Sequence, residues 1–214
     1  PGGDYVIRVH GVIRARGRLN ANLVLALGGE DILADIPGEP TREPVYDSPA
    51  RWITPAHQDE ASIAGASVVT PMEVLSTHLM ETVKSQLPAL LTLGSLQRLM
   101  QELRGLSDEG RAQSYQRVFD NLVPDKVAPE QLLAVLRILL EDRVSIRNLG
   151  LIVEAIHESR SPDPEIAAEF VRRRLRGQIT EALCDPDGRL DVVQLQPGWE
   201  AEFLRAEAET GRGA

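Results

Sequence analysis

The chain has 214 residues, of which 43% are hydrophobic and 26% are charged, and its formal net charge is −9. This is the composition of a globular protein, with enough residues for one large domain or for two or three small ones. The negative charge argues against nucleic acid as a partner, because contacts to phosphates supply most of that affinity.

Two further features narrow the class of protein. Cys184 is the single cysteine, which excludes an intrachain disulfide and fits a reducing compartment. No stretch approaches the roughly 20 apolar residues that span a bilayer, and the opening PGGD is not a signal peptide. This opening predicts a fragment of a longer protein.

The first element expected is a β-hairpin. The stretch YVIRVHGVIRARGRL alternates, so that Tyr5, Ile7 and Val9 share one face, and a turn is expected near Gly11. An isolated hairpin is marginal in water, so another segment must complete its sheet. The candidates are residues upstream of Pro1 and three short apolar runs, at 23–27, 32–36 and 67–69.

Residues 22–70 are expected to form a small α+β insert. Five prolines between positions 37 and 55 exclude a long helix there and favour extended or turn geometry. A segment this long is uncommon as a plain connection and is usually functional when it is ordered. One short helix is predicted near Gln58–Ala64.

From Thr70 onward the sequence predicts helices. Thr70 as N-cap, Pro71 at the first helical position and Glu73 make a capping-box start. Apolar residues then recur as one stripe, formed by Met72, Leu75, Leu79, Val83, Leu87 and Leu90. Further helix starts are expected at Ser95, Pro129, Ser145 and Asp163, the last opening a single helix that continues through EIAAEFVRRRLRGQITEAL. Residues 185–203 predict a turn, a strand, a turn and another helix start, before a polar tail.

The sequence offers no constellation for catalysis or metal binding. His78 lies in the first long helix, but a zinc site needs three or four suitably spaced ligands and the other histidines lie in unrelated segments. Cys184 precedes Asp185, which opposes the lowered thiol pKa that a nucleophile needs. The spacing of DPDG does not fit a calcium loop and favours a β-turn. We therefore expect no enzyme, no catalytic residue, no metal and no cofactor.

The arginine run RRRLR at 172–176 has two interpretations. It could bind an anion, or it could form a solvated or subunit-facing charged surface. The second interpretation is favoured, because Glu169 and Arg173 are spaced as a stabilising i,i+4 pair.

Val74 and Thr77 lie on nearly the opposite side of their helix from the apolar stripe. They could face solvent, or they could form a wall of a shallow contact surface if the proline-rich insert folds over them. Helical geometry alone leaves both possibilities open.

Several motifs occur in the order and spacing of one known family. The most specific are VVTPMEVLSTHL and VSIRNL, and EPTREPVYDSPARWI and FVRRRLRGQI accompany them. On these motifs, residues 5–195 resemble the cytoplasmic part of the type III secretion export gate, the family of flagellar FlhA and its injectisome counterparts. The flagellar branch is favoured over the injectisome branch.

The resemblance implies an α+β fold of four subdomains. The first would comprise residues 1–21 plus 71–90, lacking its N-terminal segment, with residues 22–70 inserted as the second. Residues 91–170 would be a helical third subdomain, and residues 171–214 the start of a truncated α/β fourth. The membrane-spanning region of the family would precede this chain.

The resemblance also implies a function. Members form a ring, typically of nine subunits, on the cytoplasmic face of the bacterial inner membrane. They dock export chaperone–substrate complexes there and contact other export-apparatus proteins, including the ATPase complex. In flagellar members the chaperone enters a hydrophobic dimple between the first two subdomains, lined by an acidic residue, an aromatic residue three positions later and the threonine of the THL motif.

These dimple positions match Glu43, Tyr46 and Thr77 in this sequence, where the family usually has Asp and Phe at the first two. Val74 shares a helix face with Thr77, and we add it as our own inference. His78 is expected to be a structural neighbour. The competing hypotheses are an injectisome export gate and a soluble homo-oligomeric adaptor unrelated to secretion.

Overall fold

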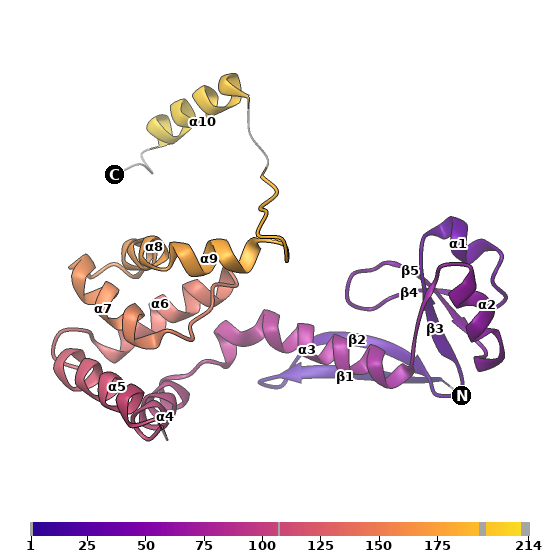
Figure 1. Cartoon of the computed structure of the whole chain (residues 1–214), viewed down its shortest axis with the longest axis horizontal. Coiled ribbons are helices and arrows are strands. Elements are labelled where there is room, and N and C mark those ends of the chain that lie inside the picture. The colour runs from indigo at the N-terminus through magenta and orange to yellow at the C-terminus, as the bar shows by residue number, and fades with distance from the viewer. Residues whose placement is uncertain (1, 107, 193–195, 211–214) are drawn as a thin grey trace.

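The computed structural model describes residues 2–106, 108–192 and 196–210. The fold is α+β, as expected: two small β-sheets lie in the first 70 residues, and helices dominate the rest (Figure 1).

The predicted hairpin is confirmed. Strands β1 (Gly2–Val9) and β2 (Val12–Asn20) pair antiparallel, and both turn residues between them have positive φ, His10 at 50° and Gly11 at 80°. This is the turn geometry that matches the twist of two-residue hairpins. In the described part of the chain no third strand joins this sheet. The hairpin instead packs against α3 (Pro71–Leu90), and a helix can stabilise a hairpin as a further strand can.

The insert forms a sheet of its own. Its antiparallel strands are β3 (Val24–Leu27), β4 (Glu39–Arg42), β5 (Pro49–Ile53) and β6 (Ser67–Val69), in the spatial order β4-β5-β3-β6. The runs at 23–27 and 67–69 are therefore strands, but of this sheet and not of the hairpin's. The run at 32–36 is not a strand, since most of it lies in helix α1 (Glu30–Ala34).

The insert sheet is covered on both faces. On one face α1 and α2 (Gln58–Ile63, which confirms the predicted short helix) pack over Val24, Ala26 and Ile53. On the other face, alternate strand residues contact α3 in a second cluster, made of Leu25, Ala50, Trp52 and Val74. This second cluster joins the insert to α3.

The buried face of α3 differs from the apolar stripe. The capping box of Thr70 and Glu73 is confirmed. The residues buried along the helix, however, are Val74, His78 and Thr82, whereas Met72 and Leu79 of the stripe remain 68% and 47% exposed. Polar residues can occupy the buried face because their polar groups have partners. The Thr82 hydroxyl donates to the carbonyl of His78 at 2.7 Å, and the His78 ring contacts the hairpin.

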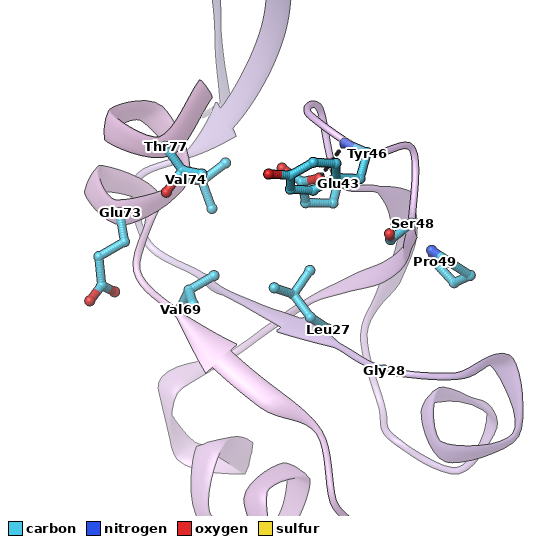
Figure 2. A pocket seen from close by; sticks show the side chains of 10 residues that line it. All are labelled: Leu27, Gly28, Glu43, Tyr46, Ser48, Pro49, Val69, Glu73, Val74 and Thr77. Carbon is cyan, nitrogen blue, oxygen red and sulfur yellow. Dashed lines mark hydrogen bonds between the residues drawn. The ribbon is translucent and has the colours of Figure 1, made fainter. Parts of the chain in front are cut away.

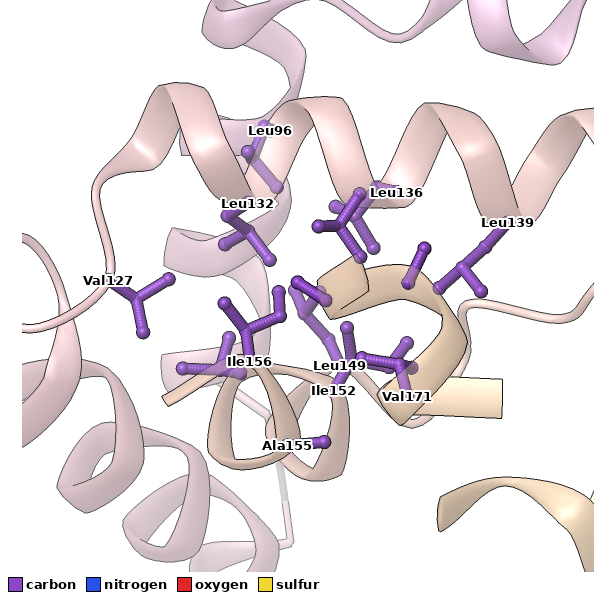
Figure 3. Close-up of a cluster of buried hydrophobic side chains, with 14 of the residues drawn as sticks. Leu96, Val127, Leu132, Leu136, Leu139, Leu149, Ile152, Ala155, Ile156 and Val171 are labelled. Atoms are coloured by element: carbon purple, nitrogen blue, oxygen red, sulfur yellow. The ribbon is translucent and has the colours of Figure 1, made fainter. Parts of the chain in front are cut away.

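Helices follow α3 throughout the described chain. They are α4 (Leu93–Arg104), α5 (Glu109–Leu122), α6 (Pro129–Glu141), α7 (Leu149–Ser159), α8 (Pro164–Arg174), α9 (Arg176–Leu183) and α10 (Pro197–Thr210). Side chains from α4 to α9 share one core, whose fully buried members include Leu96, Leu132, Leu136, Leu139, Ile152 and Ile156 (Figure 3). Phe119 and Leu175 belong to the same core.

Two of the four expected helix starts are confirmed, at Pro129 and Asp163. Two are displaced: α4 is capped by Thr92 instead of Ser95, and α7 by Asn148 instead of Ser145. The expected single helix after Asp163 is also wrong, because Leu175 separates α8 from α9.

Arg137 connects the helical block to α3. Its Nε and Nη2 both donate to the carbonyl oxygen of Leu91, at 3.1 and 2.8 Å, just after α3 ends. The helix α6 that carries Arg137 also packs against α3. One helix therefore contacts the hairpin, the insert and the helical block.

The elements predicted for residues 185–203 are confirmed in part. DPDG is a turn, with Gly188 at φ 76° and the Asp185 carboxylate accepting from the amides of Asp187 and Arg189. The expected strand does not form over residues 189–192, and residues 193–195 lie outside the described chain. The boundary expected between the third and fourth subdomains, after residue 170, falls within helix α8, and Val171 on its far side is buried in the helical core. The division into four subdomains stays a prediction.

Candidate functional site

A recess of about 490 Å³ lies between α3 and the insert. Its walls come from three parts of the chain that are separate in sequence: the end of β3, the β4–β5 loop, and β6 with the start of α3 (Figure 2). The lining residues are Leu27, Gly28, Glu43, Tyr46, Ser48, Pro49, Val69, Glu73, Val74 and Thr77. All four residues predicted to contact a partner are among them, namely Glu43, Tyr46, Val74 and Thr77.

The base of the recess is apolar. Leu27 and Val69 project into it from neighbouring strands, and Val74 projects from α3 (Figure 2). Val74 is only 4% exposed and belongs to the cluster that joins α3 to the insert sheet. It therefore both holds the two parts together and forms the inner wall.

Tyr46 forms the outer lip. It lies in the β4–β5 loop with 70% of its surface exposed, and its ring extends toward α3 (Figure 2). Exposed apolar surface with a polar rim commonly marks an interaction site.

Glu43 lies behind Tyr46 and is 8% exposed. Its Oε1 accepts from the backbone amide of Val45 at 3.0 Å, and its Oε2 accepts from that of Tyr46 at 2.8 Å. Both carboxylate oxygens are thus engaged within the loop.

Thr77 is exposed on the first turns of α3, and the capping box fixes where those turns begin. The Glu73 carboxylate accepts from the Thr70 amide at 2.7 Å and from the Thr70 hydroxyl at 2.8 Å. These bonds, the backbone one first, lower the pKa of Glu73. The carboxylate points away from the centre of the recess (Figure 2). Through its bonds to Thr70 it orders the start of the helix that carries Val74 and Thr77.

His78 follows Thr77 and is 6% exposed. Its Nδ1 lies 2.6 Å from the hydroxyl of Tyr5 on β1, and the two rings meet edge to face. Burial raises the pKa of Tyr5, and the Glu43 carboxylate raises it further. This contact agrees with the structural role expected for His78.

The arginine run is ion-paired. Arg172 pairs with Asp142 and Glu169, and Arg173 pairs with Glu169 at 3.5 Å, which confirms the expected i,i+4 pair. Arg174 lies 3.6 Å from Glu158. These contacts favour a charged surface with internal partners over an anion site.

Neither a metal-binding cluster nor a membrane-spanning helix occurs among the described residues. No group of three or more His, Cys, Asp or Glu side chains in residues 2–106, 108–192 and 196–210 is arranged to hold a metal ion. Over the same residues, every helix is too short or too polar to cross a bilayer.

Sequence reasoning missed the base of the recess. Leu27 and Val69 lie in two of the apolar runs that are candidates for completing the hairpin's sheet. Their positions in the recess depend instead on the pairing of β3 with β6, which lie far apart in the sequence. The apolar runs could have indicated the two strands, but they do not show which strands pair with each other.

Comparisons with known proteins place the chain in one family. The FHIPEP family profile matches residues 1–214. Flagellar biosynthesis protein FlhA of Caulobacter vibrioides is 33% identical over 98% of this chain and 29% of its own length. FlhA of Treponema pallidum is 31% identical over 92% of this chain and 27% of its own length. The chain thus spans under a third of these curated relatives.

Solved structures show the same fold at lower identity. The Chlamydia pneumoniae CdsV protein matches 98% of this chain and 64% of its own chain, with a TM-score of 0.73 and 21% identity. A complex of C. pneumoniae CdsV and CdsO gives a TM-score of 0.67 at 20% identity, over 97% of this chain and 65% of that one. The nonameric EPEC SctV-C gives 0.59 at 19% identity, over 92% of this chain and 66% of that one.

Proposed function

This chain belongs to the FHIPEP family, and from that premise we propose that it is the docking platform of a flagellar type III export gate. It would bind export chaperone–substrate complexes before their transfer across the bacterial inner membrane. One observation carries the proposal: Glu43, Tyr46, Val74 and Thr77, which lie in two separate stretches of sequence, line a single recess.

The chemistry of the recess suits protein recognition. Its base is apolar, its lip is an exposed aromatic ring, and Thr77 supplies a hydroxyl at the edge. Binding pockets for peptide helices combine these features, since an apolar anchor supplies binding energy and polar edges orient it. Two carboxylates lie at the site, those of Glu43 and Glu73, and both accept hydrogen bonds from nearby backbone amides. The proposal therefore assigns the recess no catalytic step.

Assembly and location form part of the same proposal. The solved neighbours include a nonameric SctV-C and a complex of CdsV with CdsO. We extend this to a homo-nonameric ring that contacts other export-apparatus proteins, including the ATPase complex. The ring would lie on the cytoplasmic face of the inner membrane, attached through a transmembrane region outside this chain.

Titration calorimetry with a cognate flagellar chaperone–substrate complex tests the proposal. Tyr46→Ala and Thr77→Asp are each expected to weaken binding at least about tenfold, because a lost anchor or a buried unpaired charge costs about 1.4 kcal/mol or more. The matched controls are Ile63→Ala, an exposed apolar residue away from the recess, and Ser76→Asp, the exposed neighbour of Thr77. Both controls should bind as the parent does.

Three outcomes would redirect the proposal. Normal binding by both recess variants, with their folds intact by circular dichroism, would make the recess assignment wrong. Binding of an injectisome chaperone complex but not of the flagellar one would favour the injectisome gate. Binding of neither, together with self-association, would favour an oligomeric adaptor.

A further inference from the structure

We propose that Glu43 is a positioning residue, whose carboxylate holds the backbone of Tyr46 and so fixes the aromatic lip, and that it does not pair with the docked partner. The inference rests on the proposed function only where it concerns binding. The hold on the loop itself is a property of the free protein.

Hydrogen bonds from the loop backbone to Glu43 fix the position of Tyr46. The two carboxylate oxygens of Glu43 accept from two successive amides, those of Val45 and Tyr46, at 3.0 and 2.8 Å. The main chain of Glu43 closes the same loop, since its amide donates to Ser48 at 2.9 Å and its carbonyl accepts from Asp47 at 3.0 Å. One residue therefore makes four hydrogen bonds within residues 43–48.

Burial leaves Glu43 poorly placed to meet a partner. The residue lines the recess but is only 8% exposed, and both carboxylate oxygens are turned to the amides of its own loop. Among the ion pairs of the described chain, none involves Glu43, so its charge is stabilised by the two amides. Charge-assisted hydrogen bonds of this kind are strong, and a partner cation would have to compete with them.

Tyr46 depends on this hold because its side chain does not pack into the core. The residue is 70% exposed, so the position of its ring follows the position of the backbone. A second contact braces the far side of the loop, where Arg42 donates to the Asp47 carbonyl at 2.6 Å and Asp47 has a positive φ of 54°. A loop ordered before binding loses less conformational entropy on binding, which raises affinity.

Residue-resolved hydrogen exchange tests the hold without any ligand. In Glu43→Ala, the amides of Val45 and Tyr46 should exchange at least about tenfold faster, because both lose their acceptor. Glu43→Asp should keep most of the protection, since an aspartate accepts readily from amides two and three residues onward. Glu43→Gln, with one acceptor oxygen, should fall between them. Glu39→Ala, on the exposed part of β4, is the matched control and should change neither amide.

A double-mutant cycle tests the link to binding, with the chaperone–substrate complex used for the recess. Glu43→Ala should weaken binding about tenfold and Glu43→Asp much less. Adding Glu43→Ala to Tyr46→Ala should weaken it no further, because Glu43 acts through Tyr46.

Each contrary result has its own meaning. Unchanged exchange at Val45 and Tyr46 in Glu43→Ala would overturn the inference, and so would additive losses in the double variant, which would indicate direct contact with the partner. If Tyr46→Ala binds normally while the exchange results hold, the proposed docking fails and the hold on the loop stands. If Glu43→Ala does not fold, the aspartate and glutamine variants decide the exchange test.

Discussion

The hydroxyl of Tyr5 lies 2.6 Å from Nδ1 of His78, a residue 73 positions away. This contact fastens the hairpin to α3 one residue from Thr77. The cross-strand partner of Tyr5 is Gly17, and the Tyr5 ring lies where a side chain of Gly17 would be. The absence of that side chain lets the ring reach His78.

Gly17→Ala should therefore destabilise the fold. An added Cβ would overlap the Tyr5 ring, which must move and lose its bond to His78. Overpacking of this kind costs about 1–3 kcal/mol. Urea unfolding followed by circular dichroism measures the change. Gly3→Ala is the matched control on β1, because nothing lies within 4 Å of its added Cβ; equal stability of the two variants would contradict the prediction.

Tyr5→Phe should change how stability depends on pH. Burial and then Glu43 raise the pKa of Tyr5, so the folded protein holds the phenolic proton more tightly than the unfolded chain does. By linkage, this contribution is complete below the unfolded pKa of about 10 and is lost as the pH rises through the folded pKa. The parent should thus lose stability more steeply than Tyr5→Phe above about pH 9.5. Thermal unfolding between neutral pH and pH 11 measures this, and parallel curves would refute it.

Substitutions on the two faces of α3 should differ in how much they destabilise the fold. Val74→Ala removes buried methyl groups from the cluster with Leu25 and Trp52, which should cost about 1–3 kcal/mol. Leu79→Ala, on the apolar stripe, should change stability by less than about 0.5 kcal/mol, because Leu79 is already 47% exposed to solvent. Denaturant midpoints at constant m-value compare the two. A larger loss from Leu79→Ala would restore the stripe as the packed face.

Arg137→Met should loosen the junction of α3 with the helical block. The substitution keeps an apolar stem of similar length and removes both donors to the Leu91 carbonyl. Hydrogen bonds from charged donors contribute about 1.5–3 kcal/mol, so a loss near the lower bound is expected for this half-buried pair. Chemical unfolding measures it against Arg98→Met, an exposed arginine on α4. A loss no greater than that of the control would show that the contact contributes nothing.

Local signals predicted much of the fold. The hairpin, the short helix near Gln58 and the capping box at Thr70 each depend on neighbouring residues, so the sequence pattern contained them. The identity of Glu43, Tyr46 and Thr77 as candidates came from family resemblance, and the structure brings them into one recess. Their role in binding chaperones stays a prediction.

Tertiary contacts explain what the pattern did not contain. The buried face of α3 carries His78 and Thr82, whose burial is tolerated because Tyr5 and the helix backbone supply their hydrogen bonds. A hydrophobicity pattern cannot include a partner 73 residues away. Likewise, family resemblance names Glu43 as a lining residue of the dimple, but its hydrogen bonds to two amides depend on the closed form of the loop, which no local pattern contains.

The length of α3 gives it a mechanical property. Its 20 residues form a rod of about 30 Å, with the recess at one end and the Arg137 contact just beyond the other. A tilt of about 5° about Thr77 would move Leu91, which lies about 21 Å further along the axis, by about 2 Å if the helix stays straight. A shift of that size would lengthen the two hydrogen bonds that Arg137 donates to the Leu91 carbonyl, so a partner that tilts the first turns of α3 would also load this contact.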